Sequence, residues 1–332
     1  MKAQQMQAVY LIPTRNGGVY EYRQVNKPEA AGGQVLVQVI AAGINRGEIL
    51  MVGGFNAKNP RLKPMAAGIE FAGEIVEVGE DATGWHVGER VMGRGMGSYA
   101  EFTLASCMTL MRIPDGLSFA EAAAIPNVFI TAHDALVSNA QIQKDDTVLV
   151  TAASSGIGTA AIQLAKYYNA RTIVASTRDA NKAVALRNIG ADVVIDTSKP
   201  GFPKLVEQHT DGEGVDIIID SVGGPMFADN LNMLAVKGRI ISVGRNAGEI
   251  GQIDLDEIAN KRAQVIGTTF RTRTPQEAWR CFEVFVEDCM GGFTDGSLRP
   301  VLDRTFPFES LLLAHNYMLD DGQVGKIVLV RE

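Results

Sequence analysis

A run of small residues near the middle of the chain has the composition of a phosphate-binding turn. The stretch VLVTAASSGIGTAAIQLAK, residues 148–166, passes from an apolar β-branched segment through these small residues into a helical pattern. In a dinucleotide-binding turn, small residues let backbone amides approach a pyrophosphate at the N-terminus of a helix. We predict cofactor contacts from five residues of the turn: Ser154, Ser155, Gly156, Ile157 and Gly158. The alternative is a glycine-rich turn that packs a helix tightly on a sheet without a ligand.

The end of the next strand-like segment indicates which nicotinamide cofactor binds. An acidic residue there holds the ribose 2′-hydroxyl of NAD, whereas a cation accommodates the 2′-phosphate of NADP. The chain has Ser176, Thr177 and Arg178 at this point, followed by Lys182. Because arginine can bind a phosphate through two charge-assisted hydrogen bonds, we predict NADPH. In the alternative interpretation, Arg178 and Lys182 are solvated and Asp179 binds the ribose.

The sequence SSGIG also occurs in short-chain dehydrogenases, which carry it near the N-terminus and catalyse with a Tyr-x-x-x-Lys pair. None of the seven tyrosines in this chain has a lysine four residues later. The turn also lies much later in this chain than in that family. We therefore exclude the short-chain interpretation.

Length and composition are typical of a two-domain globular protein. At 332 residues the chain exceeds the usual size of one hydrophobic core, and 46% of its residues are hydrophobic and 21% charged. A net charge of −7 and the lack of basic blocks argue against nucleic-acid binding. We find no apolar run that approaches a membrane span and no signal-peptide pattern. With only three cysteines, a disulfide framework is not expected, and we predict a cytoplasmic location.

Alternating patterns place the predicted cofactor turn within a parallel sheet. Between residues 145 and 270, near-continuous apolar segments alternate with segments of helical periodicity. This is typical of βαβ units in a doubly wound sheet whose strands are buried on both faces. The preceding residues are rich in β-strand patterns and glycine, which predicts a compact, antiparallel, barrel-like domain. After residue 270 come two helical patterns and a short strand, GKIVLVRE, which we expect to return to the first domain.

Nine segments together resemble the zinc-independent quinone oxidoreductase branch of the medium-chain dehydrogenase/reductase superfamily. They are AAGINRGE, GIEFAGEIVEVG, VGERVMG, GSYAEF, AAIPNVFITAHDAL, VTAASSGIGTAAIQLAK, GVDIIIDSVGG, GRIISVG and GKIVLV. Their order and spacing cover nearly the whole chain. The resemblance implies an α/β fold with a GroES-like β-rich catalytic domain, residues 1–125 and 271–332. It also implies a Rossmann domain, residues 126–270, with a doubly wound parallel sheet that binds NADP(H).

The resemblance further implies that no metal takes part in the reaction. Zinc-containing members carry Cys where this chain has Asn45, and Gly-His-Glu where it has Gly68-Ile69-Glu70. Asparagine and isoleucine are not typical zinc ligands. Three cysteines cannot form the four-cysteine lobe of those members. The four histidines are isolated in the sequence, and we interpret each as a surface or packing residue.

The resemblance also assigns individual site residues. Asn45 is expected to donate a hydrogen bond to a developing oxyanion, and Thr131 to bind the cofactor beside the nicotinamide. Without the resemblance, Asn45 is interpreted as a turn residue and Thr131 as a helix hydroxyl that bonds its own backbone. Further cofactor contacts are expected after the strands of the second domain, at Ser221, Val222, Val243, Gly244, Phe270 and Arg271. Lys326 approaches the 2′-phosphate in some relatives, and the alternative is an ordinary turn lysine before the last strand.

These residues predict an NADPH-dependent, metal-free reductase that transfers hydride to a quinone or a similar activated carbonyl compound. One alternative is a double-bond reductase for 2-alkenals, enones or enoyl thioesters, and another is an NADPH-binding protein without turnover. Several relatives have a tyrosine after the asparagine, where enoyl reductases place a proton donor, but residues 45–58 contain none. The segment AQVIGTTF is a candidate exposed edge strand, and together with the resemblance it predicts a homodimer.

Overall fold

The computed structural model describes residues 4–55, 58–59 and 61–331, and the chain divides into two units. The first unit comprises Met1–Asn127 and Pro300–Glu332, and the second comprises Val128–Arg299. The first boundary lies close to the expected one after residue 125. The chain returns to the first unit at residue 300, not at residue 271 as expected, because the long helix α9 (Pro275–Asp295) belongs to the second unit.

Aromatic packing shows why α9 stays with the second unit. The ring of Phe293 packs edge-on against that of Phe129, with 5.0 Å between the ring centroids. The ring of Phe285 packs in the same way against His133, at 5.7 Å. Phe285 and Phe129 are at most 1% exposed. The helix therefore supplies part of the hydrophobic core of this unit.

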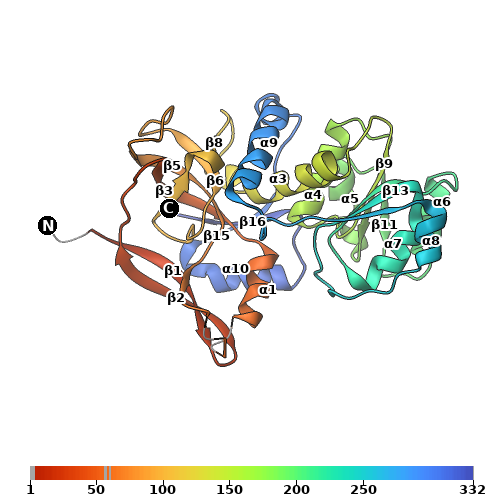
Figure 1. Cartoon of the computed structure of the whole chain (residues 1–332), viewed down its shortest axis with the longest axis horizontal. Coiled ribbons are helices and arrows are strands. Elements are labelled where there is room, and N and C mark those ends of the chain that lie inside the picture. The colour runs from red at the N-terminus through yellow and green to blue at the C-terminus, as the bar shows by residue number, and fades with distance from the viewer. Residues whose placement is uncertain (1–3, 56–57, 60, 332) are drawn as a thin grey trace. The chain divides into compact units, whose positions relative to one another are not determined.

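A seven-stranded sheet and a three-stranded sheet form the framework of the first unit. The larger sheet has the order β15-β16-β3-β5-β6-β8, with β7 also paired to β3, and the smaller has the order β2-β1-β4. Only β15 and β16 pair in parallel, whereas the other pairs are antiparallel. The elements, labelled in part in Figure 1, are β1 (Gln5–Thr14), β2 (Gly17–Asn26), β3 (Gln34–Gly43), α1 (Arg46–Gly54), β4 (Met65–Ala66), β5 (Glu70–Val78), β6 (Arg90–Arg94), β7 (Phe102–Ser106), η1 (Cys107–Thr109), β8 (Leu110–Arg112), α2 (Phe119–Ala122), β15 (Leu302–Pro307), η5 (Phe308–Ser310), α10 (Leu311–Leu319) and β16 (Lys326–Val330).

A six-stranded parallel sheet in the order β11-β10-β9-β12-β13-β14 forms the centre of the second unit. Helix α3 (Pro126–His133) begins just before this unit and leads into it. The remaining elements are a π-helix η2 (Asp134–Asn139), β9 (Thr147–Val150), α4 (Gly156–Tyr167), β10 (Thr172–Thr177), η3 (Ala180–Lys182), α5 (Ala183–Asn188), β11 (Val193–Asp196), α6 (Phe202–His209), β12 (Val215–Asp220), η4 (Gly224–Met226), α7 (Phe227–Met233), β13 (Leu234–Ser242), α8 (Leu255–Lys261) and β14 (Gln264–Gly267).

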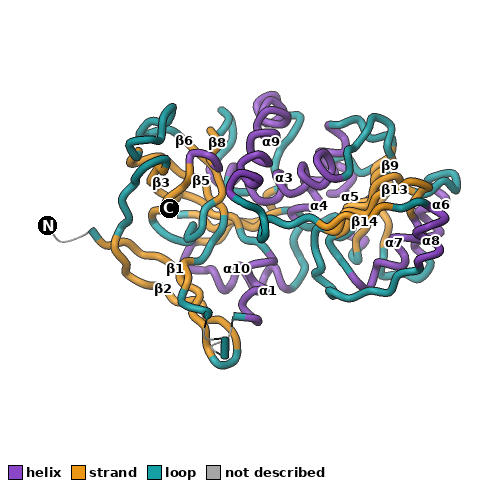
Figure 2. Tube along the Cα trace, viewed as in Figure 1, coloured by secondary structure: helices purple, strands orange, loops and turns teal. Residues whose placement is uncertain are grey.

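The strands of the second unit are apolar on both faces, which is the pattern of a covered parallel sheet. Leu149, Ile218 and Ile240 come from three neighbouring strands, and each is at most 1% exposed. They belong to one hydrophobic cluster that also includes residues of α6 and α7. Helix α4 packs beside β9 and β10, whereas α7 and α8 pack against each other and beside β13. Figure 2 shows the purple helices flanking the orange strands.

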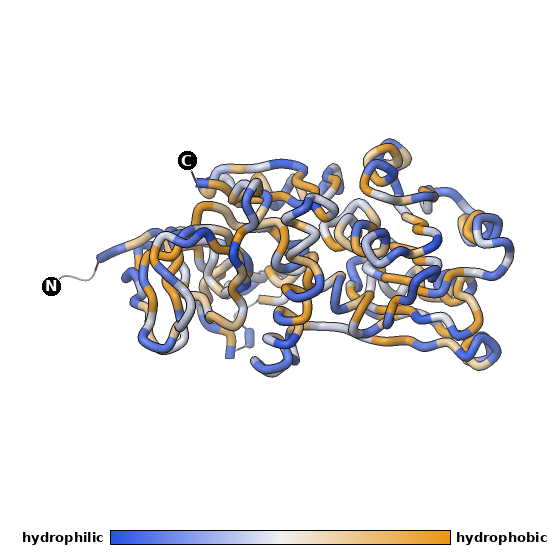
Figure 3. Tube along the Cα trace, turned by 90° about the horizontal axis from the view of Figure 1, so that it is seen from above, coloured by the Kyte–Doolittle hydropathy of each residue, from blue (hydrophilic) through white to orange (hydrophobic). Residues whose placement is uncertain are grey.

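The elements predicted from periodicity are confirmed. The six apolar segments of the second unit form β9 to β14, with β14 at one edge of the sheet. The last segment of the chain forms β16 and pairs with β3, so the tail returns to the first unit as expected. Hydrophobic segments recur along both units between hydrophilic turns (Figure 3). In the part of the chain that the structure describes, no helix has both the length and the apolar character needed to cross a membrane.

Candidate active site

The turn between β9 and α4 presents backbone amides at the start of a helix. Ser155 is the N-cap of α4: its Oγ accepts a hydrogen bond from the Gly158 amide at 3.0 Å. The carbonyl oxygen of Ser155 accepts another from the Thr159 amide. Among the described residues, the amides of Gly156 and Ile157 have no partner. A helix N-terminus with two such amides is suited to bind the pyrophosphate of a dinucleotide.

The same turn is tightly packed against the preceding strand. A Cβ atom at Gly158 would lie 2.5 Å from the carbonyl oxygen of Ala153, so only glycine fits there. Ala152 has φ 46°, a left-handed conformation that alanine rarely adopts. Ser154, the next residue but one, is half-buried. Backbone strain of this kind clusters at ligand-binding turns, which agrees with the predicted role of residues 154–158.

The residues predicted to determine specificity for NADPH over NADH lie at the end of β10. Ser176 and Thr177 are buried at the end of the strand, and Arg178 follows them at the surface. Asp179, the alternative ribose ligand, is the N-cap of η3, and its Oδ1 accepts a hydrogen bond from the Asn181 amide at 2.9 Å. The carboxylate of Asp179 therefore has a local structural role, which favours the interpretation in which the cation contacts the cofactor.

Lys182 lies at the end of η3, and only 8% of its surface is exposed. This burial differs from the solvated helix start that the alternative interpretation assumed. Together with Arg178, it places two cations close to the carboxyl end of β10.

The carboxyl ends of β12 and β13 complete this edge of the sheet. Asp220, at the end of β12, accepts hydrogen bonds from the Thr151 hydroxyl at 3.0 Å and from the amides of Val222 and Gly223 at 3.0 and 3.1 Å. Burial raises the pKa of the Asp220 carboxyl above its ordinary value. Neither Asp220 nor Thr151 was predicted as a site residue, because they bind each other across 69 positions of the sequence.

A buried hydroxyl without a partner lies at the same edge. The Oγ atom of Ser221 is buried, and it has no hydrogen-bond partner among the described residues. A Cβ atom at Gly244 would lie 2.9 Å from the carbonyl oxygen of Ser221, so the ends of β12 and β13 approach closely. Val222 and Val243 are half-buried beside them. An unpaired buried hydroxyl at the end of a strand beside β9 fits a site built to receive a polar ligand such as a dinucleotide.

The loop after β14 is attached to the residues that follow α3. Thr268 and Arg273 both donate hydrogen bonds to Oδ2 of Asp134, at 2.7 and 2.6 Å. Between them lie Phe270 and Arg271, two of the predicted cofactor residues, and the Arg273 guanidinium lies 4.9 Å from the centroid of the Phe270 ring. Asp134 was not predicted, and it positions this loop. Thr131 lies three residues earlier, on α3, and is half-buried.

In the first unit, the amide of Asn45 lies at the centre of a buried polar cluster. Its Nδ2 atom donates to Oε1 of Glu70 at 2.8 Å and to Oε2 of Glu48 at 3.2 Å. Its Oδ1 atom accepts hydrogen bonds from Asn127 Nδ2 at 2.8 Å and from Lys326 Nζ at 2.9 Å. Asn45 is the N-cap residue of α1, but its side chain does not cap the helix. Both donor protons and both acceptor positions of the amide are used within the cluster.

Glu70 and Lys326 form an ion pair inside this cluster. Lys326 Nζ lies 2.6 Å from Oε1 of Glu70, and the two residues are 3% and 0% exposed. The ammonium group also donates to the carbonyl oxygen of Ile44 at 2.7 Å and to Asn45. The second carboxylate oxygen of Glu70 accepts the amide of Asn127 at 2.8 Å. All three protons of the ammonium group thus have partners, as a buried charge requires.

Glu48 is the other carboxyl group of the cluster. The Tyr99 hydroxyl lies 3.1 Å from Oε2 of Glu48 and is itself buried. Burial raises the pKa of Glu48 to about 7, and the charge of Glu70 adds to this effect, while the hydrogen bond from Asn45 opposes it. Burial also holds the pKa of Tyr99 well above its ordinary value. Glu48 is therefore the group in this cluster whose charge changes near neutral pH.

The sequence matches known families in both units. Residues 31–115 match the alcohol dehydrogenase GroES-like domain, and residues 156–287 match the family described as zinc-binding dehydrogenase. The human quinone oxidoreductase is 31% identical over 90% of this chain and 89% of its own length. A quinone oxidoreductase-like protein 2 homolog of Nematostella vectensis is 34% identical over 89% of this chain and 81% of its own. The chain belongs to the medium-chain dehydrogenase/reductase superfamily.

Solved structures of the superfamily agree with this assignment. Mycobacterial Rv1454c, solved in complex with NADPH, has a TM-score of 0.86 and 26% identity, covering 98% of this chain and all of its own. The CurK enoyl reductase has a TM-score of 0.84 and 26% identity, covering 98% of this chain and 99% of its own. The protein is thus an oxidoreductase of the medium-chain superfamily, with a GroES-like and a Rossmann-like domain.

The cluster corrects two expectations for this medium-chain protein. Asn45 was expected to donate to a substrate oxyanion, but both of its amide protons are bonded to Glu70 and Glu48. Lys326 was expected near a 2′-phosphate or in an ordinary turn, but its ammonium group is buried against Glu70. Both residues therefore act in the cluster, and neither side chain has a donor left for a ligand. Long-range contacts between α1, β5 and β16 create this arrangement, and the local sequence does not reveal them.

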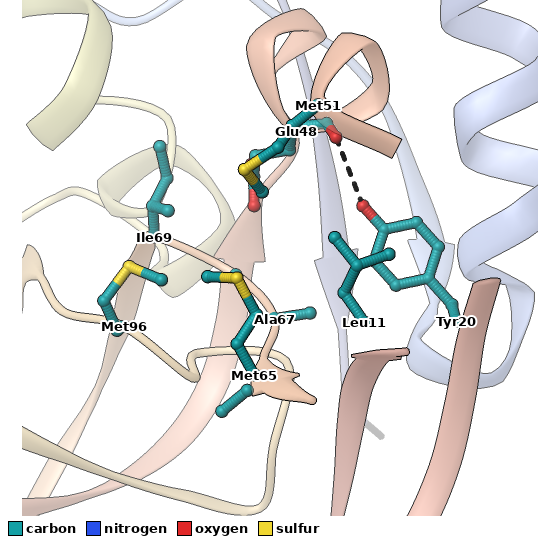
Figure 4. A pocket seen from close by; sticks show the side chains of 10 residues that line it. Leu11, Tyr20, Glu48, Met51, Met65, Ala67, Ile69 and Met96 are labelled. Carbon is teal, nitrogen blue, oxygen red and sulfur yellow. Dashed lines mark hydrogen bonds between the residues drawn. The ribbon is translucent and has the colours of Figure 1, made fainter. Parts of the chain in front are cut away.

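A small pocket opens beside the cluster in the first unit. Its cavity volume is about 10 Å³, which is room for about one water molecule. Figure 4 shows the Tyr20 hydroxyl pointing toward the carbonyl oxygen of Glu48, 3.5 Å away. Three methionines and other small or apolar residues line the rest of the pocket: Leu11, Met51, Met65, Ala66, Ala67, Gly68, Ile69 and Met96. Tyr20 and these methionines were not among the predicted site residues.

Proposed function

We propose that the protein is an NADPH-dependent, metal-free reductase that transfers hydride to a quinone or a similar activated carbonyl compound. The observation that carries the cofactor assignment is the end of β10, where Ser176, Thr177 and the cation Arg178 replace the acidic ribose ligand of NAD sites. Asp179, the nearest carboxylate, caps η3 instead. The related Rv1454c structure contains NADPH, which supports the same choice.

The residues that fit NADPH lie at the carboxyl edge of the parallel sheet. The amides of Gly156 and Ile157 would bind the pyrophosphate, and the unpaired hydroxyl of Ser221 would donate to a polar group of the cofactor. Arg178 and Lys182 would bind the 2′-phosphate, and Thr131 and the loop carrying Phe270 and Arg271 would contact the nicotinamide half. When bound, NADPH supplies the hydride, and the protein supplies position and a dry environment.

The metal-free part of the proposal rests on the donor set of the first unit. Asn45 and Ile69 stand where zinc-containing relatives carry Cys and His. The ammonium group of Lys326 lies between Asn45 and Glu70, at 2.9 and 2.6 Å. A cation already neutralises the carboxylate there, so the cluster would repel a second cation.

The chemistry of quinones and the names of the relatives support this acceptor class. Quinones accept hydride readily, and their oxygen can take a proton from water, so the site needs little acid catalysis. The human and Nematostella relatives carry the quinone oxidoreductase name. Reduction of an enone or enoyl double bond is the second candidate reaction. The similar fold of the CurK enoyl reductase supports this candidate.

Steady-state kinetics test the proposal. Purified protein should oxidise NADPH, followed by its loss of absorbance, when given 1,4-benzoquinone or 9,10-phenanthrenequinone, and should do so unchanged after dialysis against EDTA. Faster turnover with an enone series would favour the double-bond reductase. Tight NADPH binding without oxidation by any acceptor would contradict both enzymes and indicate a binding protein. Loss of activity on EDTA treatment would contradict the metal-free part alone.

We also propose that the protein forms a homodimer through β14. This strand ends the six-stranded sheet, so one side of its backbone has no strand neighbour among the described residues. Val265 on this strand is 44% exposed, which is unusual for an apolar side chain in a sheet. Pairing with β14 of a second copy would satisfy the edge and cover this residue.

A further inference from the structure

We propose that Asp134 and Arg273 hold the loop of residues 268–274 in one shape, and that this pair, the loop clamp, sets how tightly the nicotinamide half of NADPH binds. The inference rests on the proposed function, in which Phe270 and Arg271 of this loop contact that half of the cofactor. Asp134 and Arg273 are positioning residues, since they act through the loop. All four residues lie in the second unit.

The loop begins at the edge of the sheet where the expected cofactor residues gather. Gly267, the last residue of β14, pairs with Ser242 at the end of β13, and the amide of Thr268 donates to the carbonyl oxygen of Ser242 at 3.1 Å. Val243 and Gly244, two of the expected cofactor residues, follow directly on β13. The start of the loop is therefore fixed beside the proposed cofactor site.

The carboxylate of Asp134 joins both ends of the loop to the helical segment after α3. Asp134 lies in the π-helix η2 and is 2% exposed. Its Oδ2 atom accepts hydrogen bonds from the Thr268 hydroxyl at 2.7 Å and from the Arg273 guanidinium at 2.6 Å. Short π-helical segments are rare and lie frequently at functional sites. One buried carboxylate thus holds the first residues of the loop and the last.

The guanidinium of Arg273 fixes the shape of the loop between these ends. Its Nε atom donates to the carbonyl oxygen of Thr269 at 3.2 Å, and its central carbon lies 4.9 Å from the centroid of the Phe270 ring. Another of its nitrogens contacts the thiol of Cys281 on α9. A planar group with several donors can bind the backbone, the carboxylate and the ring at once, whereas the compact ammonium group of lysine cannot.

Further donors hold the carboxylate of Asp134 in one orientation. Burial raises the pKa of the Cys281 thiol to about 11, so the thiol keeps its proton at neutral pH. This thiol lies 3.6 Å from Oδ1 of Asp134 and is the donor in that contact. The side chain of Asn139 donates to Oδ2 at 3.1 Å. Because its carboxylate is bonded on both oxygens, Asp134 is a rigid anchor for the loop.

The part of the loop between the two anchors faces solvent. Arg271 and Thr272 are exposed, and the amide of Arg271 donates to the hydroxyl of Thr269 at 3.1 Å. A loop that is already ordered loses little conformational freedom when a ligand binds. Without the clamp, a smaller fraction of molecules holds the loop in this shape, so the apparent dissociation constant rises in inverse proportion. The adenosine half of the cofactor, whose 2′-phosphate is assigned to Arg178, should be unaffected.

Arg273→Lys tests the loop clamp, with Arg239→Lys as the matched control. Arg239 forms an ion pair with Asp146 at 2.9 Å in the same unit, but Asp146 lies just before β9, at the opposite end of the sheet from the cofactor residues. Calorimetric titration measures the binding of NADPH and of adenosine 2′,5′-bisphosphate, which has the 2′-phosphate but no nicotinamide half. Arg273→Lys should raise the dissociation constant of NADPH about 10-fold and leave that of the bisphosphate unchanged. Arg239→Lys should change neither.

Two substitutions of Thr268 test the other hydrogen bond to Asp134 with the same two ligands. Thr268→Val removes the hydroxyl at nearly constant volume, whereas Thr268→Ser keeps it. We expect Thr268→Val to raise the dissociation constant of NADPH about 5-fold, again without an effect on the bisphosphate. Thr268→Ser should bind both ligands as the wild type does.

The bisphosphate separates the loop clamp from general structural support. If Arg273→Lys and Thr268→Val weaken NADPH and the bisphosphate in equal proportion, the pair supports the whole unit and the clamp is overturned. If both variants bind NADPH as tightly as the wild type, the clamp is overturned and the proposed function stands. If the wild type binds neither ligand, the proposed function fails, and the clamp fails with it.

Discussion

The ammonium group of Lys326 and the carboxylate of Glu70 lie 2.6 Å apart in the interior of the first unit. They come from β16 and β5, near opposite ends of the sequence, and Asn45 contacts both. A buried ion pair of this kind depends on complete hydrogen bonding, because each charge has lost its water. The C-terminal strand is therefore joined to the N-terminal part of the unit by charge as well as by backbone pairing.

Lys326→Met should lower the free energy of unfolding by about 3–5 kcal/mol, because it leaves the Glu70 carboxylate buried without a cation. Urea denaturation would measure this change. The double variant Lys326→Met/Glu70→Gln should regain part of the loss, since neither charge remains. The exposed pair Arg23–Glu21 provides the control: Arg23→Ala should leave the urea concentration at the midpoint of unfolding nearly unchanged. A loss in the double variant as large as the sum of both single losses would contradict this account.

Gly43→Ala should disturb the same cluster by steric conflict. A Cβ atom at Gly43 would lie 2.3 Å from Oε1 of Glu70 and 2.6 Å from the carbonyl oxygen of Ala123. We expect a loss of about 1–3 kcal/mol in urea denaturation. Gly47, in α1, has no atom within 4 Å of its Cβ position, so Gly47→Ala should be neutral or stabilising. Equal effects of the two substitutions would show that crowding at Glu70 is not the cause.

The second unit could be predicted from sequence much more fully than the first-unit cluster. Buried parallel strands have a local signature, so β9 to β14 and the turn at Ser155–Gly158 follow from apolar runs and small residues. The cofactor role proposed for Arg178 was predicted from its position at the end of the strand that follows this turn. Within this unit, Asp220 and Asp134 escaped prediction because each binds a hydroxyl group that is distant in sequence, that of Thr151 for Asp220 and that of Thr268 for Asp134.

The cluster and the pocket of the first unit depend on contacts that no periodicity records. Asn45 bonds Glu70 and Lys326, which lie 25 and 281 positions away. Family resemblance marked Asn45 and Lys326 as site residues but assigned their side chains to ligands. Tyr20 belongs to no sequence motif. It lies at the pocket because β2 pairs with β1, which places Tyr20 opposite Leu11.

Glu48→Gln should change how stability depends on pH. The carboxyl of Glu48 has a pKa of about 7 in the folded protein, raised from an ordinary value of 4.5. Between these values the folded state binds more protons than the unfolded state, so this group makes wild-type stability fall as the pH rises. Glutamine does not titrate, and the stability of the variant relative to wild type should rise by about 3 kcal/mol from pH 4 to pH 8. Urea denaturation at both pH values measures it; a constant difference would contradict the raised pKa.

Val265→Lys should weaken the proposed dimer. Two lysines would meet across the two-fold axis of a β14–β14 pair, where like charges repel and the apolar contact is lost. Light scattering after size exclusion should show wild type at twice the chain mass and the variant shifted toward monomer. Val184→Lys is a suitable control, because Val184 is an exposed valine, 67% accessible, on α5, which leads into the strand at the other edge of the sheet. A wild-type monomer, or dimers in both variants, would contradict pairing through this edge.

Arg178→Ala should weaken NADPH binding about 10- to 100-fold, because it removes charge-assisted hydrogen bonds to the 2′-phosphate. NADH has no such phosphate, so its affinity should change little, and the ratio of the two dissociation constants is the decisive quantity. Fluorescence titration of both nucleotides measures it. Arg187→Ala, which removes an exposed cation further along on α5, is the control for general electrostatic attraction. If Arg178→Ala weakens the binding of NADPH and of NADH equally, the 2′-phosphate contact is refuted. The alternative, in which Asp179 binds the ribose, would then be favoured.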